Sequence, residues 1–117
     1  MHGAIQTLLL PFASGDLAPP EGRWTFFGAR ADAELGTVFA RADLLCEQPM
    51  RPDFRALEKA GFEVVAHIDD AAGGRFDGAL VLLGRHRRVN EARIARAARL
   101  ARPGAPVLVV GDKKLGA

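Results

Sequence analysis

Residues 76–117 read FDGALVLLGRHRRVNEARIARAARLARPGAPVLVVGDKKLGA, and this stretch carries the clearest structural pattern in the chain. An apolar run at Ala79–Leu83 precedes a basic cluster and an Arg- and Ala-rich segment, Asn90–Ala101, which is predicted to be a helix. Arg102-Pro103-Gly104 ends that helix, and a second apolar run follows at Val107–Val110. The order strand, helix, strand predicts a parallel βαβ unit and therefore an α/β fold.

The same alternation continues toward the N-terminus. Apolar runs predict strands at 24–28, 43–47, 63–68, 78–83 and from 106 onward. These runs are continuous rather than alternating, which indicates strands that helices bury on both faces of a mainly parallel sheet. Right-handed crossovers then favour a Rossmann-like layout of about five strands. A short helix over residues 2–10 is expected to end at Pro11.

Length and composition limit the class of protein. A chain of 117 residues with 49% apolar and 26% charged residues is one globular domain, and its net charge of +2 gives no strongly basic overall field. Cys46 is the single cysteine, so no internal disulfide forms, and a lone thiol fits the reducing cytoplasm. The apolar run Leu8–Leu10 is too short to cross a bilayer. We therefore expect a cytoplasmic protein with no membrane partner.

Two segments near the C-terminus resemble class I S-adenosylmethionine-dependent methyltransferases. The sequence LARPGAPVLVV at Leu100–Val110 is similar to the L-K-P-G-G-x-L-x-x-V join of those enzymes. More narrowly, Leu83–Ala92 and Val109–Gly116 are similar to the basic loop, helix start and V-V-G-x-N-x-x-G turn of RsmC-type small-subunit (16S) ribosomal RNA guanine-N2 methyltransferases. The turn matches in part, because Asp112 precedes Lys113 where the family has Asn.

The resemblance extends over residues 22–117 and implies a particular part of such an enzyme. RsmC-type proteins carry two methyltransferase-like domains in tandem, of which the first is degenerate and the second catalytic. The chain is similar to the first, which implies a class I methyltransferase-type fold that lacks the C-terminal antiparallel hairpin. Residues 1–117 would then be a fragment of a two-domain protein, with the catalytic domain of the same chain as partner. S-adenosylmethionine would belong to that catalytic domain.

The family's cofactor elements can be compared with this sequence position by position. In place of a glycine-rich turn after the first strand, Gly28 is followed by Arg30 and Asp32, whose side chains would crowd a ligand. Glu47 either matches the acid that holds the ribose hydroxyls or is a solvated strand-end carboxylate. The slot that carries Asn-Pro-Pro and an aromatic residue in the family reads Gly-Arg-His-Arg at 84–87. We expect no catalytic residue, with Gly28 and Glu47 as the remaining candidates for cofactor contact.

Basic residues follow the fourth and fifth predicted strands. The carboxyl ends of parallel strands share one edge of a sheet, so these residues are expected to form one positive surface. We call it the basic rim; its members are Arg85, His86, Arg87, Arg88, Lys113 and Lys114. Such a surface attracts RNA phosphates whatever the base sequence, and the alternative is a solvated helix face partly balanced by Glu91. Four arginines spaced by three are placed to extend it: Arg93, Arg96, Arg99 and Arg102.

Two further expectations concern metals and the last strand. His2, His67 and His86 lack the spacing of metal ligands and Cys46 is alone, so no metal site is expected. The strand at 107–110 would lie at the edge of the sheet with unpaired backbone groups. We expect a second copy, a swapped segment or the N-terminal helix to cover it.

The sequence leaves three functions open. The first is a non-catalytic domain that supports the catalytic domain of an rRNA methyltransferase and contacts RNA through the basic rim. The second is a small enzyme or binder that uses S-adenosylmethionine or a nucleotide through Gly28 and Glu47. The third is an interaction module that dimerises through residues 107–110.

Overall fold

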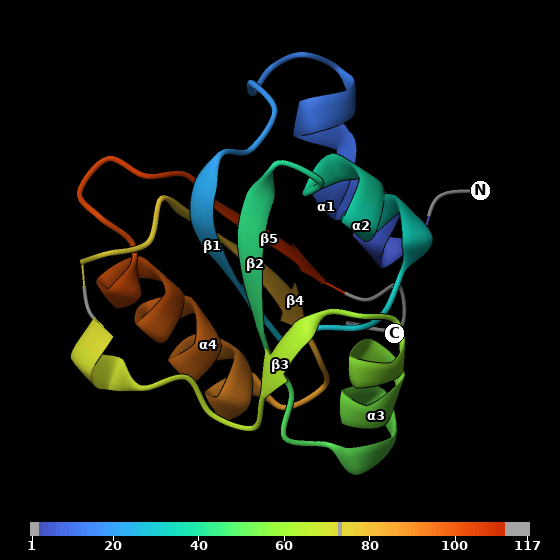
Figure 1. Cartoon of the computed structure of the whole chain (residues 1–117). Helices are drawn as coiled ribbons and strands as arrows, with labels where there is room; N and C mark the ends of the chain where they lie inside the picture. The colour runs from blue at the N-terminus through green and yellow to red at the C-terminus, as the bar shows by residue number, and fades with distance from the viewer. Residues whose placement is uncertain (1–2, 73, 112–117) are drawn as a thin grey trace.

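The computed structural model describes residues 3–72 and 74–111, which contain one five-stranded sheet with helices on both faces (Figure 1). The strands are β1 (Gly22–Phe27), β2 (Ala42–Glu47), β3 (Glu63–Val65), β4 (Gly78–Leu83) and β5 (Val107–Gly111). They lie in the order β3-β2-β1-β4-β5, and every neighbouring pair is parallel. The strand order reverses between β1 and β4, as in Rossmann-like sheets. The predicted fold class is therefore confirmed.

Helices connect and cover the strands. In the described part of the chain they are α1 (Ala4–Ala13), α2 (Ala33–Val38), α3 (Arg51–Lys59), α4 (Arg87–Leu100) and a single-turn 3₁₀ helix, η1 (Asp70–Ala72). The first three α-helices pack on one face of the sheet, and α4 packs on the other (Figure 1). The two layers of helix explain why the strands are apolar at consecutive positions.

The two faces of the sheet form separate cores. Phe26 points into the core under α1, α2 and α3 together with Leu57, whereas its neighbour Phe27 points toward α4 and Leu100. All four side chains are completely buried. Cys46 lies in the first core, where burial raises the pKa of its thiol to about 12, so it acts as an apolar side chain.

Helix α1 continues through Pro11 to Ala13, so the predicted end at Pro11 is wrong. Pro11 lies in the last turn, where its missing N–H removes only one intrahelical hydrogen bond. The ring of the next residue, Phe12, packs edge-on against Trp24 and Phe39, with centroid distances of 5.7 and 5.9 Å. These contacts hold the last turn against the sheet.

Strand β3 ends at Val65, not at Ile68 as predicted. The backbone N–H of Ile68 donates to the side chain of Glu47 at 2.8 Å instead of to a neighbouring strand. The chain therefore leaves the ladder early, and the last residue of β2 holds the loop that follows β3.

Strand β5 is an edge strand and pairs with β4. Leu108 and Val110 pack into the core beside α1, and Val109 is 39% exposed. The N-terminal helix thus covers one face of β5 and not its backbone edge, which the expectation concerned. No described strand pairs with its outer backbone edge.

Candidate functional site

The carboxyl ends of β1, β2 and β4 meet at one edge of the sheet, which is where ligands of open α/β sheets bind. Gly28 follows β1, Glu47 ends β2 and Gly84 follows β4. We call this region the carboxyl edge. Helix α4 starts at the same edge, since the turn after β4 leads directly into it (Figure 1). The two cofactor candidates and the start of the basic rim are therefore brought to one side of the molecule.

Glu47 is bound to an arginine from α4. Its Oε1 lies 2.8 Å from Nη1 of Arg96, and its Oε2 accepts the backbone N–H of Ile68 at 2.8 Å. The side chains of Glu47 and Arg96 are 9% and 15% exposed, so the ion pair is largely removed from water. Both carboxylate oxygens have partners, and the alternative of a solvated strand-end carboxylate is wrong.

Further contacts hold the guanidinium of Arg96 in place. Nη2 donates to the carbonyl of Ile68 at 2.8 Å, and Nε donates to Oδ1 of Asp70 at 3.1 Å. The Arg96 Cζ lies 5.1 Å from the ring centroid of Phe27, a cation–π distance. His67 also contacts this group, with its Nε2 3.3 Å from Nη2 of Arg96 and its Nδ1 3.9 Å from Oε2 of Glu47. The buried charge of Arg96 is therefore paired and its donors are used, as a stable buried ion pair requires.

A second arginine of α4 lies against the turn after β1. Nη1 of Arg93 donates to the carbonyl of Leu82 at 3.0 Å. Gly28 has a φ of +74°, and a Cβ at this position would lie 2.5 Å from the Leu82 oxygen and 2.8 Å from Nη1 of Arg93. Glycine is required here by the left-handed backbone and by these close approaches. Burial lowers the pKa of Arg93 from its ordinary value, and the charge of Glu47 opposes this shift.

The turn after β4 is fixed by Asn90, a residue that the sequence analysis misses. Its side-chain Oδ1 accepts the N–H of Gly84 at 2.9 Å, and its Nδ2 donates to the Gly84 carbonyl at 2.9 Å. Helix α4 starts at Arg87, earlier than predicted, so Asn90 lies in its first turn and reaches back to the strand end. The sequence did carry a signal for this contact, because Asn90 follows soon after the glycine that ends the strand.

Four members of the basic rim lie together at the start of α4: Arg85, His86, Arg87 and Arg88. All four side chains are exposed, and Arg87 pairs with Glu91 at 3.0 Å on the helix surface. Cations at a helix start oppose the helix dipole, which favours anions at that end. Lys113 and Lys114 lie outside the described residues.

The other arginines of this region do not extend the basic rim. Besides the two described above, Arg99 pairs with Asp70 at 3.2 Å, and Arg102 pairs with Asp77 at 3.0 Å. The hydrogen bond from Arg96, with smaller contributions from Arg99, lowers the pKa of Asp70 from its ordinary value. Each of the four arginines is bound to an acid or a carbonyl, so the expectation of a continuous patch is wrong.

Two more properties of the described residues bear on function. Within 3–72 and 74–111, no group of three or more His, Cys, Asp or Glu side chains is arranged to hold a metal ion, and no helix is both long and apolar enough to cross a membrane. The large apolar side chains exposed in the same ranges are all aliphatic: Leu10, Met50, Val89, Ile94 and Val109. No Phe or Trp ring of these ranges is therefore among the exposed side chains, whereas the imidazoles of His67 and His86 are exposed.

The sheet order and the helix layers define a Rossmann-like α/β domain. Among solved structures, the T. thermophilus 16S rRNA N2 G1207 methyltransferase (RsmC), in complex with AdoMet and guanosine, has a similar fold, with a TM-score of 0.62 at 22% sequence identity. The match covers 86% of this chain and 28% of that chain, so this chain spans only part of the length of that enzyme. No family model and no curated protein matches the sequence. The fold is therefore of the methyltransferase type.

Proposed function

We propose that the chain is a non-catalytic, N-terminal methyltransferase-like domain of an rRNA guanine-N2 methyltransferase. It supports the catalytic domain of the same protein and helps that domain to bind RNA. The protein acts in the cytoplasm. The observation that carries the proposal is the buried ion pair between Arg96 and Glu47 at the carboxyl edge. The fold shared with a methyltransferase that was solved with AdoMet and guanosine supports the class. S-adenosylmethionine is then the cofactor of the catalytic domain.

An adenosyl group does not fit the residues of the carboxyl edge. A class I site needs a free carboxylate at the end of the second strand and an open glycine turn after the first. Here Arg96 binds the carboxylate of Glu47, and Arg93 lies against Gly28. Side chains of α4 thus take the positions that such a ligand would need, so Gly28 and Glu47 have structural roles in this proposal.

The turn after β4 supports the same function. In the methyltransferases that the sequence resembles, this turn carries Asn-Pro-Pro and an aromatic residue, which orient the amine to be methylated. Here both backbone groups of Gly84 are bonded to Asn90, and Arg85 and His86 follow. The turn offers no proline and no Phe, Tyr or Trp ring, and the side chain of Asn90 from the following helix closes it.

Contact with RNA rests on the basic rim. Arg85, His86 and Arg88 are exposed, and no described acid is bonded to them, in contrast to the paired arginines further along α4. Exposed cations of this kind bind phosphates and displace counterions. Because no described Phe or Trp ring is exposed, we expect contact with the phosphate backbone rather than stacking of bases on such rings.

Replacing Arg85 and Arg88 together with Gln is expected to weaken binding to a small-subunit rRNA fragment and to flatten its salt dependence. Each lost phosphate contact lowers the slope of log K against log salt by about 0.7–0.9. Fluorescence anisotropy between about 50 and 200 mM salt measures that slope. The matched control is Arg41→Gln with Arg75→Gln, which removes the same charge from exposed arginines before β2 and β4. Equal losses in both double variants would contradict a local RNA contact at the basic rim.

Dimerisation through β5 is a second candidate function, because the outer edge of this strand pairs with no described strand. The N–H of Ala79 donates to Pro106, so the parallel ladder places the bonds to β4 at alternate residues and leaves the backbone of Val109 facing outward. Val109→Pro removes that outward donor while sparing the bonds to β4.

For this second candidate, sedimentation equilibrium is expected to show a dimer for the unchanged chain and for Val109→Thr, which keeps the N–H. Val109→Pro is expected to be a monomer with unchanged circular dichroism. A chain that sediments as a monomer at every concentration rules out this function.

A further inference from the structure

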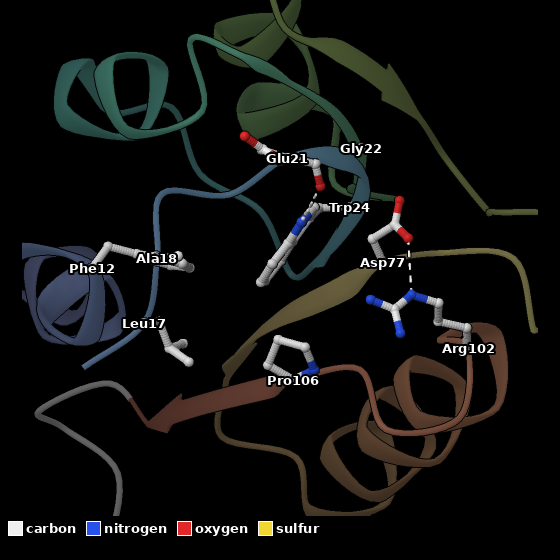
Figure 2. A pocket seen from close by; sticks show the side chains of 9 residues that line it. All are labelled: Phe12, Leu17, Ala18, Glu21, Gly22, Trp24, Asp77, Arg102 and Pro106. Atoms are coloured by element: carbon white, nitrogen blue, oxygen red, sulfur yellow. Dashed lines mark hydrogen bonds and ion pairs between the residues drawn. The ribbon is translucent and has the colours of Figure 1, made fainter. Parts of the chain in front are cut away.

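A cavity of about 490 Å³ lies at the amino ends of the strands (Figure 2). Because all the strands are parallel, this end of the sheet is opposite to the carboxyl edge. Phe12 and Leu17 line it from α1 and the loop that follows. Trp24 lines it from the start of β1, and Pro106 from the start of β5. Its size is in the range of small-molecule sites. The function proposed above gives no role to the residues at the amino ends of the strands.

The tryptophan that forms the floor of the cavity is held rigidly. Its indole N–H donates to the carbonyl of Glu21 at 3.0 Å, and its ring lies edge-on to Phe12 and Phe39 at 5.7 and 5.4 Å. A Cβ at Gly78 would lie 2.5 Å from the indole ring, so this glycine makes the space that Trp24 occupies. Trp24 is 4% exposed, so it closes one side of the cavity while most of its ring is packed in the core, and its position is set before any ligand arrives.

Arg102, whose side chain is 52% exposed, also lines the cavity, and an ion pair with Asp77 orients it. Nε of Arg102 donates to Oδ1 of Asp77 at 3.0 Å, and Oδ2 of Asp77 accepts the backbone N–H of Arg23 at 2.9 Å. The bond from Arg23, followed by the bond from Arg102, lowers the pKa of Asp77 from its ordinary value, so the carboxylate stays ionised at neutral pH. Gly22 is needed for this arrangement, because a Cβ there would overlap Oδ2 of Asp77.

The remaining donors of Arg102 face the cavity. Among the described residues, no acid or carbonyl pairs with its Nη1 or Nη2. Figure 2 shows one of these terminal nitrogens directed toward the space between Trp24 and Pro106. Two parallel N–H donors in a fixed plane match the geometry of a carboxylate.

We propose that this cavity binds a small organic monoanion, an aromatic carboxylate, with its carboxylate on Arg102 and its ring between Trp24 and Pro106. The charges around the cavity decide between anions. Glu21 and Asp77 each carry one negative charge against the single positive charge of Arg102, so the lining disfavours a dianion such as a phosphate monoester more than a monoanion held directly by Arg102. The apolar walls favour a flat hydrocarbon body over a polar one. This site is independent of the function proposed for the carboxyl edge.

The chain has one tryptophan, so its ¹⁵N-labelled form has a single indole N–H resonance that reports on the cavity floor. Titration with 2-naphthoate is expected to shift this resonance saturably, with a dissociation constant of roughly 1 mM or tighter. The neutral alcohol 2-naphthalenemethanol is expected to bind about tenfold more weakly, because it lacks the charge-assisted bonds to Arg102. The dianion 2-naphthyl phosphate is expected to bind more weakly than the acid as well.

Variants separate Arg102 from a general effect of positive charge. Arg102→Gln is expected to abolish the preference for acid over alcohol, whereas Arg99→Gln, from the end of α4, is expected to keep it. If Arg102→Gln fails to fold, the comparison of acid with alcohol on the unchanged chain still tests the proposal. The proposal is overturned if 2-naphthoate leaves the indole resonance unmoved, if acid and alcohol bind equally, or if Arg102→Gln keeps the preference.

Discussion

Replacing Arg96 with Met is expected to lower the free energy of unfolding by about 3–5 kcal/mol. The substitution keeps most of the side-chain volume but leaves the carboxylate of Glu47 buried without its cation. It also removes donors from the Ile68 carbonyl and from Asp70, which loosens the loop after β3. Urea unfolding followed by circular dichroism measures the change.

Two companion variants show whether the buried charge is the cause. Arg99→Met removes an arginine that is more than half exposed and pairs only with Asp70, and it is expected to cost less than about 1 kcal/mol. Glu47→Gln combined with Arg96→Met removes both charges while an amide oxygen still accepts the Ile68 N–H, so the double variant should be more stable than Arg96→Met alone. If Arg96→Met costs no more than Arg99→Met, the ion pair does not hold the carboxyl edge.

Gly28→Ala is expected to destabilise the domain by about 2–5 kcal/mol, as the sum of a left-handed backbone and an overpacked contact. The new methyl group would lie 2.5 Å from the Leu82 carbonyl, a backbone atom that cannot move without disturbing β4. It would also push Arg93 away from its hydrogen bond with that carbonyl. Thermal unfolding by calorimetry gives the loss of stability.

The control for Gly28→Ala is Gly15→Ala. Gly15 also has a positive φ, +84°, but a Cβ there meets nothing within 4 Å, so this variant carries only the backbone cost. The difference between the two alanine variants therefore measures the clash at the carboxyl edge. Equal losses would mean that the turn after β1 has room for a side chain, and the description of a closed edge would fail.

The pattern of apolar residues was sufficient to predict the sheet, because helices cover both of its faces. Continuous apolar runs are typical of strands that helices cover on both faces of a sheet. For β4, the predicted bounds of 78–83 are those of the structure. Element ends were less predictable, because contacts distant in sequence set them. Phe12 keeps α1 helical beyond Pro11 through its packing on Trp24, and Glu47 draws Ile68 out of β3.

The sequence predicted where the candidate site lies but not which side chains contact each other in it. The sequence places Gly28 and Glu47 at strand ends, but nothing local to Glu47 indicates that an arginine 49 positions away binds it. A signal was present in α4, where Arg93 lies one turn before the buried Ala97 and Arg96 lies one turn before the buried Leu100. Arginines on the buried side of a helix need acids or carbonyls as partners, so they were poor candidates for an RNA-binding surface.

Isothermal calorimetry of the chain with S-adenosylmethionine most directly tests the central claim of our proposal, that Arg96 on Glu47 and Arg93 against Gly28 exclude an adenosyl group from the carboxyl edge. We predict no saturable heat at ligand concentrations up to about 1 mM, which corresponds to a binding free energy weaker than about 4 kcal/mol. Stoichiometric binding with a dissociation constant near 1 μM, about 8 kcal/mol, would contradict the account and would identify the chain as a cofactor-binding methyltransferase domain.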